Sequence, residues 1–237
     1  MTVDGDVRSV GAGPARVPCF GATGAVCSDD DETMGFRLAT VADRAVLVVG
    51  DRFADVETVS GGELSSDVRE LLEAPSELTK LSERLDERAP LSDLADVELG
   101  APVAEPAQVF GVGLNYRNHA AEGGMEIPDV PLIFTKFRSA IVAPDSDIEL
   151  RSDFCDYEGE LVVAIGPGGR DIPVGEAWTH VAGLCVGQDV SDRAVQMAAT
   201  PPQFSLGKSF DTFGPIGPLL VSPDEVGDAN SLRLTTH

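Results

Sequence analysis

Three acidic side chains recur at every second position in the stretch that runs from residue 156 to residue 166. They are Asp156, Glu158 and Glu160, and the apolar run from Leu161 to Ile165 follows them. Alternate side chains of a strand point to one face, so the three carboxylates are expected to point the same way. Like charges on one face repel, and a hard divalent cation bound by oxygen ligands would relieve that repulsion. A solvated rim is the alternative in so acidic a chain, and the spacing alone leaves both interpretations open.

A histidine and a glutamate three residues apart form a second candidate. His119 and Glu122 lie in a segment that is expected to be a short helix opened by Asn115, so both would share one helix face. A carboxylate beside an imidazole fixes its tautomer and raises its basicity, which suits a general base. An exposed helix pair without a function is the alternative interpretation of this spacing.

Other chemistry-bearing residues stand at the ends of apolar runs. Asp189 follows the run from Ala182 to Gly187, and a ligand is often found at such a sheet mouth. The expected strand at 132–137 and the segment around residue 208 carry two of the three lysines of the chain, Lys136 and Lys208. His180 is expected to cap or pack near Trp178 and is not predicted to be a ligand. The glycines near residue 111 lack the spacing of a phosphate-binding loop.

The patterning predicts the elements that must position these residues. Strands with alternating or apolar character are expected first in a small N-terminal unit and then along the second half of the chain. Leucines at helical intervals predict helices over 65–91, broken near Pro75 and ended at Pro90. The strands are predicted at 35–41, 44–49, 109–114, 132–137, 161–165, 182–187, 219–221 and 232–236; those at 109–114 and 161–165 are predicted to be buried, and 214–218 is predicted to be a turn.

Composition limits the class of protein. The chain has 237 residues, of which 43% are hydrophobic, enough for one large domain or for a sizeable domain with a small appendage. A net charge of −23 argues against nucleic acid or an anionic membrane as a partner. With no signal peptide or spanning run in view, the protein is expected to be cytoplasmic. Its cysteines, 19, 27, 155 and 185, have no metal-knuckle spacing and are expected to be free thiols.

Five motifs occur in an order that resembles one known family. The motifs are Gly113-Leu114-Asn115-Tyr116 with His119 and Glu122, Phe134-Thr135-Lys136, the stretch 156–161, the stretch 188–193 and Lys208-Ser209-Phe210-Asp211. Together they resemble the catalytic domain of the fumarylacetoacetate hydrolase family, over residues 107–237. Residues 34–100 resemble that family's looser N-terminal β/α region. Residues 1–33 match nothing and are expected to form a disordered leader.

The resemblance implies a mostly β fold, a mixed-sheet roll or flattened barrel, in a homodimer. It implies Mg²⁺ or Mn²⁺ held by Glu158, Glu160 and Asp189, and it leaves Asp156 outside the ligand set. It implies that Lys208 binds a substrate carboxylate or enolate. It further implies that His119 and Glu122 activate a water beneath a closing helix.

The expected function is that of a metal-dependent hydrolase or lyase acting on a small 2-oxo or β-diketo acid, by C–C bond hydrolysis such as acylpyruvate cleavage. A decarboxylase or keto–enol isomerase acting on oxaloacetate-like or hydroxymuconate-like diacids is the alternative. A truncated relative that binds metal without turnover is a further alternative, and an acidic calcium module is a weaker one. The expected partner is a small oxo-acid, with no nucleic acid and no membrane.

The sequence departs from the family pattern near the pocket, at Phe137, Gln188, Asp192 and Ala194. The family closes its site with a glycine- and threonine-rich segment, and the sequence stops at His237 before such a segment. The catalytic domain is therefore expected to be C-terminally incomplete. The strand predicted at 232–236 would then be left with an unpaired edge that invites association with other chains.

Overall fold

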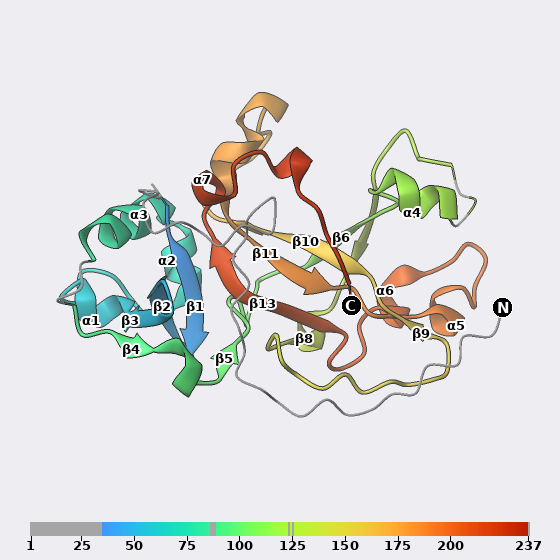
Figure 1. Ribbon diagram of the computed structural model, residues 1–237. Coiled ribbons are helices and arrows are strands. Elements are labelled where there is room, and N and C mark those ends of the chain that lie inside the picture. Colours follow the sequence, from blue (N-terminus) through green and yellow to red (C-terminus); the bar gives the residue numbers. More distant parts are fainter. Residues whose placement is uncertain (1–34, 86–88, 123, 125, 237) are drawn as a thin grey trace.

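The structure is a computed structural model, and it describes residues 35–85, 89–122, 124 and 126–236. The expected leader at 1–33 lies outside the described residues. Within the described part, the chain forms one nine-stranded sheet and two two-stranded ribbons, with short helices between them (Figure 1). One of the strand pairs in the large sheet is parallel and the rest are antiparallel. The expectation of a mostly β, mixed-sheet fold is confirmed.

The large sheet joins the two halves of the chain. Its order is β10-β11-β13-β1-β2-β3-β4, with β5 paired to β1 and β8 paired in parallel to β13. The strands are β1 (Arg37–Val41), β2 (Arg44–Val49), β3 (Arg52–Asp55), β4 (Ser92–Asp93), β5 (Leu99–Gly100), β8 (Ile141–Val142), β10 (Gly159–Ile165), β11 (Val181–Gln188) and β13 (Gly214–Val221).

The N-terminal unit contains the two strands and the helices predicted for it, and it adds β3, β4, β5 and a short helix that were not predicted. The hairpin between β1 and β2 turns through Ala42 and Asp43, which both have positive φ, as a tight two-residue turn requires. Pro75 was expected to break the helical stretch, and it opens a new helix, because a proline at the first helical position loses no intrahelical hydrogen bond. The helices here are α1 (Val56–Val59), α2 (Val68–Leu72), α3 (Pro75–Arg84) and the 3₁₀ turn η1 (Leu94–Asp96).

The two halves share one sheet and one core. β1 pairs with β13 at Arg37–Val221 and Leu38–Leu220. The largest buried cluster contains Phe36, Leu38 and Leu78 from the first half together with Cys185 and Leu220 from the second. Burial of this apolar surface therefore stabilises both halves at once.

The remaining elements surround the second half of the sheet, as Figure 1 shows. Two ribbons are formed, one by β6 with β7 and one by β9 with β12. The elements are β6 (Phe110–Gly113), α4 (Arg117–Glu122), β7 (Leu132–Thr135), η2 (Arg138–Ala140), β9 (Cys155–Asp156), η3 (Val174–His180), β12 (Ser191–Asp192), α5 (Arg193–Gln196), α6 (Phe204–Gly207), α7 (Pro223–Val226) and η4 (Ala229–Ser231).

Several strand predictions are wrong in detail. β6 and β10 were expected to be buried, yet Phe110 and Ile165 are exposed because both strands line an open pocket. The stretch 214–218, expected to be a turn, is the first half of β13. Gly217 takes a φ of 127° there, and a register shift in β11 lies opposite it. Residues 232–236 form no strand.

Two smaller expectations concern cysteines and membranes. Cys155 and Cys185 are free thiols as expected, while Cys19 and Cys27 lie outside the described residues. Among the described helices, none is long and apolar enough to cross a membrane.

Candidate functional site

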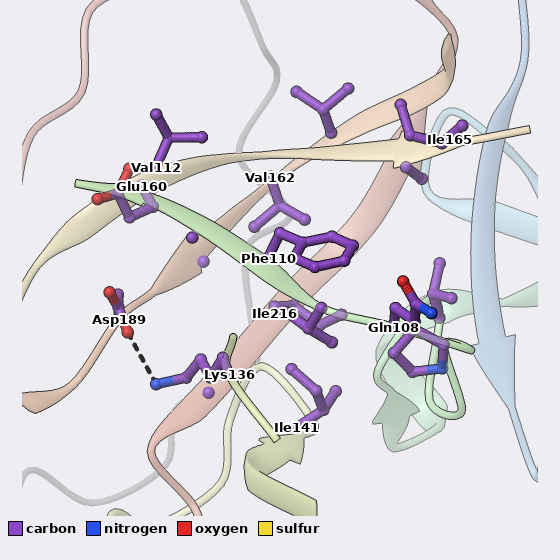
Figure 2. Close-up of a pocket in the computed structure, with 18 of the residues that line it drawn as sticks. Gln108, Phe110, Val112, Lys136, Ile141, Glu160, Val162, Ile165, Asp189 and Ile216 are labelled. Carbon is purple, nitrogen blue, oxygen red and sulfur yellow. Dashed lines mark hydrogen bonds and ion pairs between the residues drawn. The ribbon is translucent and has the colours of Figure 1, made fainter. Parts of the chain in front are cut away.

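A pocket of about 1570 Å³ lies between the β6–β7 ribbon and the strands β10, β11 and β13. Part of its wall is apolar and includes Phe110, Val162 and Ile216 (Figure 2). Charged residues of the N-terminal unit, among them Arg69 and Glu70, also line it. Glu160 and Asp189 line its polar end, and Figure 2 shows Asp189 joined to Lys136. A pocket with an apolar wall and a few convergent polar groups is typical of a small-molecule site.

Lys208 lies at the centre of this polar end. It follows directly after α6, and only 2% of its surface is exposed. Its Nζ donates to Oε2 of Glu158 at 2.7 Å, to Oδ2 of Asp189 at 2.8 Å and to Oγ of Ser191 at 2.7 Å. All three of its ammonium donors therefore have partners.

Lys136 approaches Asp189 from the other side. It follows β7, and its Nζ donates to Oδ1 of Asp189 at 2.8 Å and to the carbonyl oxygen of Lys208. Burial lowers the pKa of Lys136, and the neighbouring charge of Asp189 opposes that shift. Asp189, placed directly after β11 as the sequence predicted, thus bridges two buried ammonium groups.

Asp156 belongs to a different part of this network. The acidic stretch does not form one strand, because it divides into β9 and β10 with Tyr157 and Glu158 between them. Arg193 donates to Oδ2 of Asp156 through Nε and Nη2, at 3.1 and 2.8 Å, and its Nη1 lies 2.6 Å from Oε1 of Glu158. Glu158 therefore contacts both Arg193 and Lys208, whereas Asp156 is paired with the arginine.

Glu160 occupies a half-buried position on β10. Burial raises its pKa to about 7, and the negative charges of Asp189 and Glu158 add to that rise. A hydrogen bond from Tyr116 lowers it, as does the charge of Lys208. The other two carboxylates predicted as ligands are thus close enough to Glu160 to raise its pKa.

These residues fit a divalent cation in their chemistry. Glu158, Glu160 and Asp189 offer only oxygen donors, as Mg²⁺ and Mn²⁺ prefer, and their mutual repulsion is what a cation would offset. Within the described part of the chain, however, no three acidic, histidine or cysteine side chains converge tightly enough to hold a metal ion. The reason is visible in the contacts, since the ammonium groups of Lys136 and Lys208 hold the carboxylates of Asp189 and Glu158. Binding a cation would require those carboxylates to turn toward it.

The predicted histidine–glutamate pair is only partly described. His119 and Glu122 both belong to α4, which confirms the expected helix. Their side chains lie outside the described part of the structure, so their role as a general base stays a prediction. The other histidine considered, His180, meets the carbonyl oxygen of Pro167 at 2.6 Å through Nδ1.

Four residues at the candidate site were not assigned a role from the sequence. Lys136 holds Asp189, Arg193 holds Glu158, and Tyr116 lowers the pKa of Glu160. Gln196 accepts from Nη1 of Arg193 at 3.0 Å and is buried. The sequence could have pointed to Lys136, because the chain has only three lysines and two of them, Lys136 and Lys208, lie within the motifs.

Comparisons with known proteins agree with the motif order. The family description "Fumarylacetoacetate (FAA) hydrolase C-terminal" matches residues 108–237. The chain is 42% identical over 159 residues to the mitochondrial oxaloacetate tautomerase FAHD2A of Bos taurus, covering 66% of this chain and 51% of that protein. The chain therefore spans about half the length of the curated relatives it matches.

Solved structures give the same picture. A crystal structure from Mycobacterium smegmatis, provisionally named an HpcE protein, superposes with a TM-score of 0.73 at 43% identity, covering 81% of this chain and 68% of that one. The fumarylacetoacetate hydrolase of Exiguobacterium antarcticum superposes with a TM-score of 0.63 at 30% identity, with the same coverage of 81% and 68%. These likenesses agree with the mixed-sheet architecture described above.

Proposed function

The chain belongs to the fumarylacetoacetate hydrolase family, and from this premise we propose that it is a metal-dependent enzyme that interconverts the keto and enol forms of a small 2-oxo acid. Oxaloacetate is the reference substrate, because the bovine relative named above is an oxaloacetate tautomerase. Of the alternatives considered from the sequence, this keto–enol isomerisation is better supported than the C–C bond hydrolysis that was expected first.

The observation that carries the proposal is the pair of buried ammonium groups at the polar end of the pocket. Lys136 and Lys208 are 7% and 2% exposed, and both face Asp189. A 2-oxo acid brings a carboxylate, and its enolisation develops a second negative charge on oxygen. Fixed positive groups in a water-poor site stabilise developing charge more strongly than they would in water.

Glu158, Glu160 and Asp189 are the residues we propose for holding Mg²⁺ or Mn²⁺. Such a cation supplies Lewis-acid polarisation of a carbonyl oxygen and orients a chelating substrate. The protein's own contribution is the placement of these three acids on β10, on the segment before it and after β11. Arg193 and the two lysines balance their charge.

Tautomerisation moves one proton. The C–H bond next to the ketone breaks, an O–H bond forms on the ketone oxygen, and no water is consumed. We propose His119, assisted by Glu122, as the base that takes the carbon-bound proton. Lys208 would offset the negative charge on the ketone oxygen until a proton is delivered to that oxygen.

Hydrolysis of a C–C bond is the second candidate. The structural relative from Exiguobacterium antarcticum is named a fumarylacetoacetate hydrolase and is 30% identical to this chain. The same residues would serve, with the difference that the base would act on a water molecule. Decarboxylation of oxaloacetate, and metal binding without turnover, are the other outcomes that an experiment must separate.

A homodimer is also part of the proposal. Large apolar side chains outside the pocket, such as Val130, Ile133 and Phe154, are exposed in the single chain. Exposed apolar surface of this kind is typical of protein interfaces. The charge of −23 supports a partner that is neither nucleic acid nor an anionic membrane.

The test is a substrate panel with the purified chain and Mn²⁺. Enol-to-keto conversion of oxaloacetate, acylpyruvate hydrolysis, oxaloacetate decarboxylation and isomerisation of a hydroxymuconate-like diacid would be followed side by side. Mn²⁺ without protein gives the background, and Lys208→Met is the matched variant. We expect tautomerisation to be the fastest reaction and Lys208→Met to slow it by about 10²-fold or more, as the loss of one oxyanion-stabilising group does. Tautomerisation no faster than Mn²⁺ alone would contradict the proposal, and faster acylpyruvate cleavage would favour the second candidate.

A further inference from the structure

A tyrosine hydroxyl lies against the outer edge of the strand that carries Glu160. β10 is the end strand of the large sheet, so its outward backbone groups have no neighbouring strand in that sheet. The amide of Leu161 on β10 donates to the hydroxyl of Tyr116 across 3.4 Å. This contact joins residues 45 positions apart and closes part of an otherwise open edge.

The same hydroxyl lies close enough to the carboxylate of Glu160 that each group shifts the pKa of the other. A phenol has one hydrogen to donate, and a carboxylate can only accept. The Tyr116 hydroxyl accepts from the amide of Leu161, which leaves its own hydrogen free to point toward Glu160. The hydroxyl is thus held by the backbone of β10 next to one of the three proposed metal-binding carboxylates.

Tyr116 also opens α4. Its carbonyl accepts the first helical hydrogen bond, from the amide of Ala120 at 3.0 Å. The chain reaches it through Leu114, whose φ of 57° turns the backbone out of β6. A left-handed conformation is strained for leucine, so surrounding contacts must hold the turn in place.

We propose that Tyr116 is a positioning residue that couples α4 to Glu160. Through its backbone it starts the helix that carries His119, and through its hydroxyl it anchors that helix to the strand that carries Glu160. The inference rests on the proposed function, since it assigns Tyr116 a part in aligning the base helix with the metal-binding acids. The residue acts through Glu160 and α4 and does not itself need to touch the substrate.

The coupling predicts what loss of one oxygen atom would do. Tyr116→Phe keeps the aromatic ring and removes the hydroxyl. Glu160 then loses the donor that orients it, and the amide of Leu161 loses its acceptor. Groups that orient metal-binding side chains typically change metal affinity or activity by about 10- to 100-fold.

The experiment compares Tyr116→Phe with Tyr157→Phe in the full chain. Tyr157 is the other of the two tyrosines and is exposed, so its hydroxyl gives a matched control. Mn²⁺ affinity would be measured by calorimetry, kcat and KM for oxaloacetate at saturating Mn²⁺, and amide hydrogen exchange in peptides covering 114–122. We expect Tyr116→Phe to weaken Mn²⁺ binding by about tenfold or more and to lower kcat with little change in KM. We also expect it to speed exchange in α4, while Tyr157→Phe matches the parent protein.

The readouts separate this inference from the function on which it rests. If the parent protein turned over no 2-oxo acid, the proposed function would fail, and Mn²⁺ affinity with hydrogen exchange would still decide the role of Tyr116. If the parent bound no Mn²⁺, hydrogen exchange alone would decide whether Tyr116 anchors α4. Unchanged Mn²⁺ affinity and unchanged exchange in Tyr116→Phe would overturn the inference. A melting temperature equal to that of the parent excludes general unfolding as the cause of any loss.

Discussion

Single residues at the polar end of the pocket form a network of opposite charges with little access to water. Asp189 has Lys136 on one oxygen and Lys208 on the other, and Glu158 lies between Lys208 and Arg193. Removing one member of such a network leaves its partner buried and uncompensated, which costs more than the pair contributes. A substitution that removes one of these charges should therefore be compared with a similar substitution at a neighbouring residue whose ion pair is more exposed to solvent.

Asp156 and Glu158 provide that comparison for metal binding. Both contact Arg193, but Asp156 is the more exposed and has no part in the proposed ligand set. Glu158→Gln should weaken Mn²⁺ binding by about tenfold or more, because a proposed anionic ligand is lost. Asp156→Asn should change the affinity much less. Calorimetric titration of both variants is the measurement, and equal losses would remove Glu158 from the ligand set.

The raised pKa of Glu160 predicts a pH dependence of metal binding. Its pKa is about 7 against an ordinary value of 4.5, and a metal can bind the carboxylate only after the proton leaves. Below pH 7 the apparent Mn²⁺ affinity should fall by about tenfold per pH unit, and above pH 7 it should level off. Without metal, the group stabilises the fold below the unfolded pKa, and that stability is lost as pH rises through about 7. An affinity independent of pH between 5.5 and 7 would contradict this prediction.

Among the elements, two four-residue helices decide where Lys208 lies. α5 and α6 pack closely, and a Cβ atom added at Gly207 would lie 2.7 Å from the amide nitrogen of Gln196 and 2.9 Å from the carbonyl oxygen of Asp192. Both of those atoms belong to backbone and cannot rotate away. The absence of a side chain at Gly207 thus allows α6 to approach α5 and places the next residue, Lys208, at the site.

Gly207→Ala should therefore separate these helices. We expect a loss of about 1–3 kcal/mol in the free energy of unfolding, as for other substitutions that overfill a packed contact. We also expect a large loss of activity, because Lys208 moves with α6. Gly175→Ala is the control, since a Cβ atom there meets nothing within 4 Å. Denaturant unfolding and kcat would be measured for both, and equal behaviour of the two variants would argue against this account.

The sequence predicts an element correctly when neighbouring residues alone determine it, and fails when distant contacts determine it. β1 and β2 could be predicted because alternation and a tight turn are properties of neighbouring residues. The exposure of β6 and β10 could not, because apolar composition does not reveal which side of a strand faces an open pocket. β13 was missed in its first half because Gly214, Pro215, Gly217 and Pro218 also form turns elsewhere, and only pairing with β11 makes them a strand.

The residues of the candidate site likewise fall into those that sequence motifs identify and those that only long-range contacts reveal. Glu158, Glu160, Asp189 and Lys208 were identified from motif order, and the structure brings the four to one end of a pocket. The contact between Lys136 and Asp189 spans 53 residues, so no local pattern contains it. Tyr116 was quoted within a motif, yet its contact with Leu161 depends on how α4 meets the edge of the sheet.

For the whole molecule, the shared sheet predicts cooperative unfolding of both halves. Leu38 is fully buried in β1 opposite Leu220 in β13, within a core that both halves supply. Leu38→Ala should lower the free energy of unfolding by about 2–5 kcal/mol. Because Trp178, the one tryptophan, lies in the second half, its fluorescence should report the loss although the change is in the first half.

Coincidence of two probes checks this prediction. Far-UV circular dichroism follows the strands of the whole chain, and tryptophan fluorescence follows the region around η3. In the parent and in Leu38→Ala the two transitions should occur together, as in a two-state protein. Val174→Ala, at a highly exposed position, should stay within about 0.5 kcal/mol of the parent. A fluorescence transition unaffected by Leu38→Ala would show that the halves unfold independently.

The pairing of β1 with β13 also constrains how such chains can recombine. A crossover in the loop near residue 105 would seem to exchange a complete N-terminal unit between two relatives without cutting an element. Yet Arg37 and Leu38 from one parent would then have to meet Val221 and Leu220 from the other. Chimaeras made at that loop should fold only when both parents carry compatible residues where β1 pairs with β13. Recombination between relatives should therefore tend to keep the two halves of the chain together.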